Sequence, residues 1–206
     1  MTKAESASRG SEFVMGQIKE EWIVELSSPK ERVRARAAGE IYAAGRSLAE
    51  QAVHRWWENK ELAQLFGDDP EVTVGLAVRP ETFAKIREAN GQPQLAEVPA
   101  DQYASEFELH FDGRVALDVL TWRGSEGQGA IAKFLSKHGE GPQQVEFRCR
   151  NVDRATQILL EHLGILAVYP ETRPGANATR VNFFLMPVAD GKKVLIELYE
   201  APVPQP

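Results

Sequence analysis

The sequence predicts an α+β protein in which a helical N-terminal region precedes two paired βαβββ modules that form one cupped mixed sheet. Three observations lead to this prediction. Helical hydrophobic spacing runs through residues 15–66, strand-like alternation begins after Pro70, and the same order of strands and helices then occurs twice. Residues 1–14 are rich in Ser, Ala, Gly and charge, and they are expected to form a flexible leader.

Residues 15–66 are expected to be helical because their apolar side chains recur at every third or fourth position. Ser28 is the expected N-cap of the longest helix, with Pro29 in its first turn and Glu31 closing a capping box. The breaker around Pro70 ends this region. The apolar stripe must be buried, so it packs either on the rest of the chain or in a homodimer interface.

The two modules are expected at 71–122 and 142–202, within a body that spans residues 67–206. Alternation and turn residues predict strands at 71–78, 103–111, 115–120, 143–150, 165–169, 180–186 and 194–199, and helices at 80–90, 129–138 and 153–163. Asp112-Gly113 and Asp190-Gly191 mark equivalent hairpin turns. Because one module alone leaves a face of its sheet uncovered, the two modules must pair.

Composition excludes several classes of protein. The net charge is −6, and the acidic excess lies in positions 67–206, whereas a nucleic-acid-binding protein needs a basic surface. Cys149 is the only cysteine, so it forms no internal disulfide and no cysteine-based zinc cluster. The chain has no apolar stretch long enough for a transmembrane helix, and its first residues lack the apolar core of a secretory signal. A cytoplasmic protein without a membrane partner is expected.

The paired modules resemble the vicinal oxygen chelate superfamily, which includes glyoxalases, extradiol dioxygenases and bleomycin resistance proteins. Within it, the stretch Ala130-Ile-Ala-Lys-Phe-Leu-Ser-Lys-His-Gly-Glu-Gly141 and the strand after it most resemble the linker and fifth strand of methylmalonyl-CoA epimerases. Val194-Leu-Ile-Glu-Leu-Tyr-Glu200 resembles their last strand. The resemblance covers residues 71–202 and leaves out the helical N-terminal region.

The resemblance implies a divalent metal that stabilises an enolate, held by two histidines and two acidic or amide residues. The positions of those four ligands fall on Thr73, Asp118, Gln144 and Glu197, so both histidines are missing. Asp118, Gln144 and Glu197 remain as weak ligands, which suit Mg²⁺, Mn²⁺ or Ca²⁺ better than Zn²⁺ or Co²⁺, or else bind no metal. The further acid–base glutamate of the epimerases falls on Asp101, so Asp101 and Glu197 are the candidate catalytic groups.

Strand alternation predicts which side chains line the cup. The candidate ligand-binding residues are Thr73, Asp118, Gln144, Glu146, Arg148 and Tyr199. Arg148 is expected to pair with Glu146 or Glu197, or to bind a carboxylate or phosphate of the ligand. His110 lies on a central strand. Its side chain could rotate into the cup, but a surface position is expected for it.

Three functions follow from these expectations. The preferred one is a glyoxalase-like protein that binds a small molecule, has a degenerate metal site and shows little or no epimerase activity. The second is an active metal-dependent isomerase, epimerase or lyase on an acyl-CoA-like or 2-oxo substrate. The third is a non-catalytic interaction protein whose N-terminal helices recruit a partner. Whether the protein is an enzyme thus depends on the chemistry of the cup.

Overall fold

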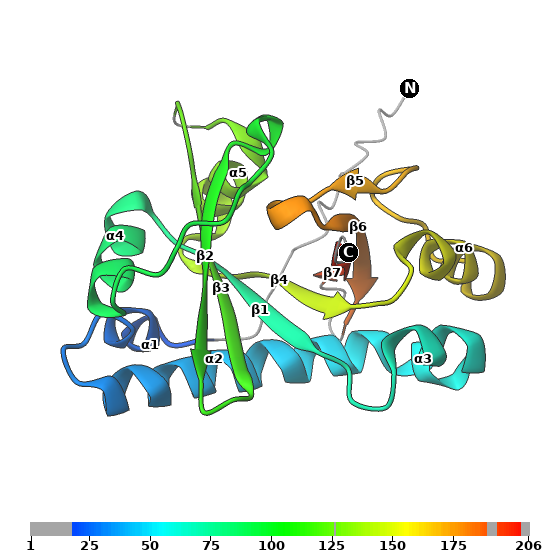
Figure 1. Cartoon of the computed structure of the whole chain (residues 1–206), viewed down its shortest axis with the longest axis horizontal. Helices are drawn as coiled ribbons and strands as arrows, with labels where there is room; N and C mark the ends of the chain where they lie inside the picture. The colour runs from blue at the N-terminus through cyan, green and yellow to red at the C-terminus, as the bar shows by residue number, and fades with distance from the viewer. Residues whose placement is uncertain (1–17, 126, 189–192, 203–206) are drawn as a thin grey trace, which may run out of the picture.

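Seven strands form one curled mixed sheet in the order β2-β3-β1-β4-β7-β6-β5 (Figure 1). This computed structural model describes residues 18–125, 127–188 and 193–202. The first module comprises β1 (Val72–Ala77), α4 (Pro80–Ala89), the 3-10 helix η2 (Ala100–Gln102), β2 (Ala104–Phe111) and β3 (Val115–Trp122). After α5 (Gly129–His138), the second comprises β4 (Gly141–Arg148), α6 (Val152–Leu163), β5 (Arg173–Pro174), η3 (Ala176–Ala178), β6 (Arg180–Pro187) and β7 (Lys193–Glu200).

The two modules join edge to edge through their first strands. β1 pairs antiparallel with β4, with Val72 opposite Phe147 and Gly75 opposite Gln144. On either side of this joint, β1 pairs parallel with β3, and β4 pairs parallel with β7. Equivalent strands therefore occupy equivalent places in the two modules. The cupped mixed sheet expected from the sequence repeat is confirmed.

One expected strand is wrong. Residues 165–169 form no strand, and the short strand before β6 is β5. The end of α6 explains the difference, because Gly164 adopts a left-handed conformation and the N–H of Ile165 donates back to the carbonyl of Leu159. The N–H of Val168 donates to the carbonyl of Phe183 on β6, and the Asn182 side chain of β6 donates to the carbonyl of Tyr169, but no strand ladder forms. At the equivalent place in the first module, the described residues form η2 instead of a strand.

The helices before the sheet are α1 (Glu20–Glu25), α2 (Glu31–Val53), η1 (His54–Glu58) and α3 (Lys60–Phe66). In Figure 1 the long α2 crosses both modules, and it contacts β1, β2, β3, β4, β6 and β7. A Cβ atom at Gly45 would lie 2.8 Å from Val74 on β1, so this glycine permits the close approach of helix and sheet. The apolar stripe of the N-terminal region is thus buried on the chain's own sheet.

The start of α2 differs from the expected cap. Lys30, not Ser28, is the N-cap residue, and its side chain makes no capping hydrogen bond. The Ser28 hydroxyl instead accepts a hydrogen bond from the N–H of Lys30 at 3.2 Å, just before the helix. The expected leader at 1–14 and the turn at Asp190-Gly191 lie outside the described residues. Within the described ranges, no helix has the length and apolar character needed to cross a membrane.

Candidate functional site

The two faces of the curled sheet have opposite chemistry. Val74 packs against α2 in the apolar core, so strand alternation turns Thr73 and Gly75 to the other face. That face lines a cavity of about 740 Å³. A cavity of this volume accommodates a drug-sized organic molecule.

Acidic side chains from four strands line this cavity. They are Glu106 and Glu108 on β2, Asp118 on β3, Glu146 on β4 and Glu197 on β7, and together they are called the acidic cluster here. Strand pairing brings them together, because Glu108 lies opposite Asp118 and Glu146 lies opposite Glu197. The side chain that would separate the two pairs is missing, since β1 has Gly75 beside Asp118. The carboxylates of the two modules therefore face one space.

Gln144 links two of these carboxylates at the joint between the modules. Its amide nitrogen donates to Glu197 Oε2 at 2.6 Å and to Glu146 Oε1 at 3.1 Å. A Cβ atom at Gly75 would lie 2.6 Å from Gln144 Cγ, so the glycine makes room for this arrangement. Because both amide hydrogens of Gln144 are used, this side chain has no further donor for a ligand.

Burial raises the pKa values in the acidic cluster. Burial first, and then the charge of Glu146, raises the pKa of Glu106 to about 8. Burial raises the pKa of Glu146 to about 7, against the opposing effect of the hydrogen bond from Gln144. For Asp118 and Glu197, burial followed by neighbouring carboxylates raises the pKa well above its usual range. Removing the last protons from this cluster therefore costs free energy unless a cation is bound.

Two buried acceptor atoms in the cavity lining have no hydrogen-bond partner among the described residues. They are Asp118 Oδ1 and Gln143 Oε1, and each of the two residues is only 6% exposed. A β-bulge positions Gln143, because the pairing of β4 with β1 shifts between Gly75 and Leu76 and leaves one extra residue in β4. An unpaired buried acceptor is costly, so both atoms favour a ligand that donates hydrogen bonds.

The rim of the cavity is built from contacts between the two modules. Arg173 donates to Asp101 Oδ2 at 2.6 Å, and its guanidinium carbon lies 4.7 Å from the centroid of the Tyr169 ring. Gln102 donates to the carbonyl of Pro174 at 2.9 Å. The charged rim groups therefore already bind each other, in contrast to the carboxylates inside the cavity.

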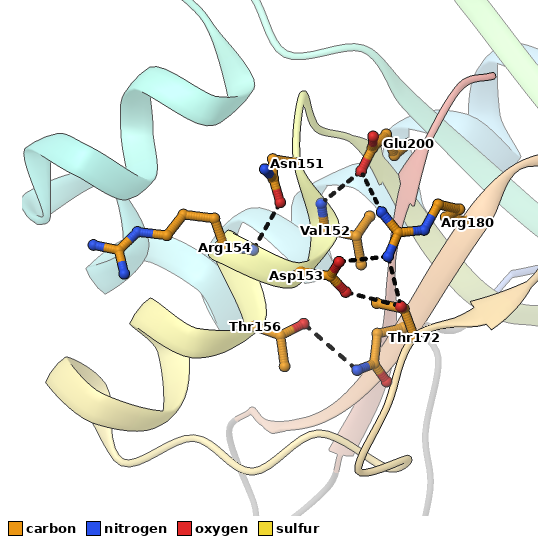
Figure 2. Close-up of polar contacts among 9 residues, drawn as sticks. Asn151, Val152, Asp153, Arg154, Thr156, Thr172, Arg180 and Glu200 are labelled. Carbon is orange, nitrogen blue, oxygen red and sulfur yellow. Dashed lines mark hydrogen bonds and ion pairs between the residues drawn. The ribbon is translucent and has the colours of Figure 1, made fainter. Parts of the chain in front are cut away.

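A polar cluster on α6 fixes the segment that leads into β5 (Figure 2). Asp153, in the first turn of α6, accepts hydrogen bonds from the Thr172 hydroxyl at 2.8 Å and from the Arg180 guanidinium. Arg180 also lies 3.6 Å from Glu200, whose carboxylate accepts the N–H of Val152 at 3.0 Å. These contacts tie the rim segment to α6, β6 and β7, which helps to hold the rim in place.

Most of the candidate site residues do line the cavity: Asp101, Asp118, Gln144, Glu146, Glu197 and Tyr199. Thr73 is buried on the cavity-facing side of β1 but does not reach the lining. The expected pairing of Arg148 is wrong, because its guanidinium donates to Glu71 at 2.9 Å and it lies outside the lining. The Tyr199 hydroxyl donates to the same carboxylate at 3.2 Å. Glu71 thus draws Arg148 away from the acidic cluster.

Several lining residues were not identified from the sequence. Glu106 and Glu108 belong to an alternating run that continues to His110, and this alternation was the signal available for a polar cavity wall. His110 lies on the same wall, but its side chain is 65% exposed and its Nε2 lies 3.0 Å from Glu108 Oε2. Arg173 and Gln143 were missed because a two-residue strand and a bulge position them, and neither has a periodic pattern.

The residues present do not fit the metal centre that the resemblance implies. Thr73 and Gln144 stand where imidazole ligands are expected, and the Gln144 amide nitrogen, not its oxygen, faces the carboxylates. In the part of the chain that the structure describes, no three His, Cys, Asp or Glu side chains are arranged to hold one metal ion. A thiolate or imidazole donor set for Zn²⁺ or Co²⁺ is therefore not assembled from these residues.

Comparison with solved structures relates this geometry to known proteins. Methylmalonyl-CoA epimerase from Mycobacterium tuberculosis is similar with a TM-score of 0.54 and 28% identity, over 68% of this chain and 93% of that one. A selenomethionine methylmalonyl-CoA epimerase is similar with a TM-score of 0.51 and 25% identity, over 66% of this chain and 100% of that one.

A hypothetical protein from Bacillus halodurans C-125 has a TM-score of 0.52 and 20% identity, over 68% of this chain and 99% of that one, which shows the fold alone. Neither the protein-family profiles nor the curated protein sequences contain a match. The aligned part is 68% of this chain for the first of these structures, which is close to the fraction that the two modules occupy. The two modules of this chain therefore have the vicinal oxygen chelate fold of the methylmalonyl-CoA epimerases.

Proposed function

We propose that this chain is a glyoxalase-like protein that binds a small molecule, with a degenerate metal site and little or no epimerase activity. The observation that carries this proposal is the chemistry at two positions, where Thr73 and Gln144 replace histidines and Gln144 is bound to Glu146 and Glu197. Without imidazole ligands the cup binds Zn²⁺ and Co²⁺ weakly. Its acidic lining also repels a substrate that carries its own carboxylate.

Two measurements on the purified full chain test this proposal. Titration calorimetry with CoCl₂ is expected to give no tight binding. Incubation with methylmalonyl-CoA in deuterium oxide, with and without MgCl₂ or MnCl₂, is expected to give no exchange of the proton beside the thioester. Tight Co²⁺ binding, or exchange at an enzymatic rate, would overturn the proposal.

A matched variant tests whether the missing histidines are the cause of weak Co²⁺ binding. In Thr73→His/Gln144→His, both imidazole positions are restored, and Co²⁺ affinity is expected to rise by about 100-fold or more relative to the unmodified chain. Gln144→His alone, which leaves the buried Thr73 in place, is the second variant and is expected to give a smaller gain. If a folded double variant gains nothing, the missing histidines are not what weakens the site.

A metal-free isomerase, epimerase or lyase is the second candidate. It is favoured by the pKa of Glu146, which burial raises to about 7, in the range that suits a general base at neutral pH. Glu197 and Asp101 are the other acid–base candidates on the cavity wall. This function predicts proton exchange without any added metal, and a loss of exchange in Glu146→Gln.

The partner-recruiting role of the N-terminal helices has less support. Ala37, Ile41 and Ala49 of α2 are fully buried in one core with the sheet, so the apolar face that would recruit a partner is already covered. A homodimer remains a prediction, and size-exclusion chromatography with light scattering tests it.

A further inference from the structure

We propose that the ligand of the cavity carries an organic cation, a protonated amine or a guanidinium group, that binds between Asp118 on one side and Glu146 and Glu197 on the other. The proposal rests on the proposed function, because it takes the cavity as a small-molecule site without a transition-metal centre. It deepens that function by naming the chemical class of the ligand.

The balance of charge in the cavity lining supports a cation. Among the described residues that form the lining, six are acidic and one is an arginine. That residue, Arg173, is already bound to Asp101 at the rim, and so it does not compensate the carboxylates inside. Burial and mutual repulsion make it costly to ionise these carboxyl groups in the empty cavity, and a cation placed between them lowers that cost.

The hydrogen-bonding groups inside the cavity give a second, independent argument. Asp118 Oδ1 and Gln143 Oε1 are buried acceptors without partners among the described residues, and both residues line the cavity. The amide nitrogen of Gln144, which also lines the cavity, is committed to Glu146 and Glu197. The two unpaired acceptors therefore suit a ligand group rich in donors, such as an ammonium or a guanidinium.

Space for this group exists at the joint between the modules. Gly75 lies opposite Asp118 on β3 and opposite Gln144 on β4, and it has no side chain to fill the gap. A Cβ atom at Gly75 would come within 3.2 Å of Glu146 Oε1, so the glycine keeps this carboxylate accessible. The cation site is therefore built into the register of three strands.

The remainder of the cavity indicates an apolar body on the ligand. Leu120, Ile131, Val181, Phe183 and Leu195 line it beside the acidic cluster. Phe183 lies directly opposite Glu197 in the pairing of β6 with β7, so an apolar group next to the cation would contact its ring. The ligand class that fits is an amphipathic amine or guanidine, with a cationic end and an apolar or aromatic end.

Three probes with one skeleton test the proposal: 4-phenylbutylamine, 4-phenylbutan-1-ol and 4-phenylbutyrate, which are respectively a cation, a neutral molecule and an anion. Binding to the purified full chain is measured at neutral pH by calorimetry and by amide chemical-shift changes. The amine is expected to bind about tenfold or more tightly than the alcohol. The butyrate is expected to give no measurable binding.

Matched variants locate the site. Asp118→Asn is expected to remove most of the preference for the amine over the alcohol, because it keeps the shape and removes the charge. Glu146→Gln is the second variant and retains the test if Asp118→Asn does not fold. Glu88→Gln, on the exposed surface of α4 and outside the lining, makes the same change of net charge and is expected to leave binding unchanged.

The outcomes distinguish this inference from the proposed function. The cation proposal is overturned if amine and alcohol bind equally, if the butyrate binds, or if no probe binds. None of these results bears on metal binding or epimerase activity. A preference for the amine that survives in both cavity variants also overturns it. Displacement of the amine by CoCl₂ with a tight, saturable affinity overturns the proposed function instead, and exchange with methylmalonyl-CoA does the same.

Discussion

The outer and inner faces of the sheet are made by the same strands, yet one is apolar core and the other is acidic. On β7, Ile196 is fully buried in the core, whereas Glu197, the next residue, lines the cavity. On β1, Val74 packs against α2, whereas Gly75 opens toward the acidic cluster. Apolar burial on the outer face offsets the cost of holding carboxylates close together on the inner face. Removing apolar side chains from the outer face should therefore lower the stability of the fold, whereas neutralising carboxylates on the inner face should raise it.

Truncating the outer face should have the largest effect. Trp56 is fully buried, and its ring lies 5.9 Å from that of Phe184 on β6. Trp56→Ala leaves a cavity between the N-terminal helices and the sheet, and it should lower the free energy of unfolding by about 3–5 kcal/mol. Urea denaturation measures this, with Val24→Ala as control because Val24 is 71% exposed. A loss below about 1 kcal/mol would mean that the helices contribute little to the core.

The inner face should make stability depend on pH. In the folded state burial raises the pKa of Glu106 from 4.5 to about 8 and that of Glu146 to about 7. Below their unfolded pKa values these groups are protonated in both states, and above them only the unfolded chain ionises freely. Stability should therefore fall as the pH rises from about 4.5 to 8.

Thermal unfolding at a series of pH values measures this dependence. Asp118 on β3 and Glu197 on β7 add to this dependence, because burial raises their pKa values as well. Glu106→Gln should flatten the profile between pH 4.5 and 8, because it removes the group with the pKa of about 8. A stability that rises through this range would contradict the assignment of a strained acidic face.

Filling the gap between the two halves of the acidic cluster should have an intermediate effect. The new methyl group in Gly75→Ala would lie 2.6 Å from Gln144 Cγ and 3.1 Å from Leu120 Cδ1. The strands must shift, which should cost about 1–3 kcal/mol of stability. Gly39→Ala on α2 is the control, because no atom lies within 4 Å of its Cβ position. An unchanged stability and an unchanged affinity for the amine probe would show that Gly75 is not needed at this place.

The smallest effect is expected at the rim. Asp153→Ala removes the acceptor for Thr172 and Arg180, but these groups are exposed and the loss of stability should be below about 1 kcal/mol. Amide hydrogen exchange in segment 164–174 should become faster while the core strands stay protected. Glu81→Ala in the first turn of α4 is the control. Unchanged exchange in this segment would mean that other contacts hold the rim.

The fold was largely predictable because its signals are local. Alternation, the Asp112-Gly113 turn and the recurring element order predicted two modules, and the β1–β4 joint confirms their pairing. Alternation also predicted the inward direction of Asp118, Gln144 and Glu197. The strand expected at 165–169 does not form, because the N–H of Ile165 donates to the carbonyl of Leu159 at the end of α6. Hydrophobic periodicity does not describe such an interaction.

Hydrophobic periodicity and the recurring order of elements were enough to predict the two-module sheet and the direction of its alternating side chains. The pairing of the polar groups depends on contacts between distant segments, which periodicity does not describe. In the folded chain Arg148 is bound to Glu71, and Asp118 Oδ1 has no partner among the residues that the structure describes. Glu106 and Glu108 line the same cavity as Glu146. The reason is that alternation fixes the face of a side chain, whereas register, bulges and loops between distant segments fix its partner.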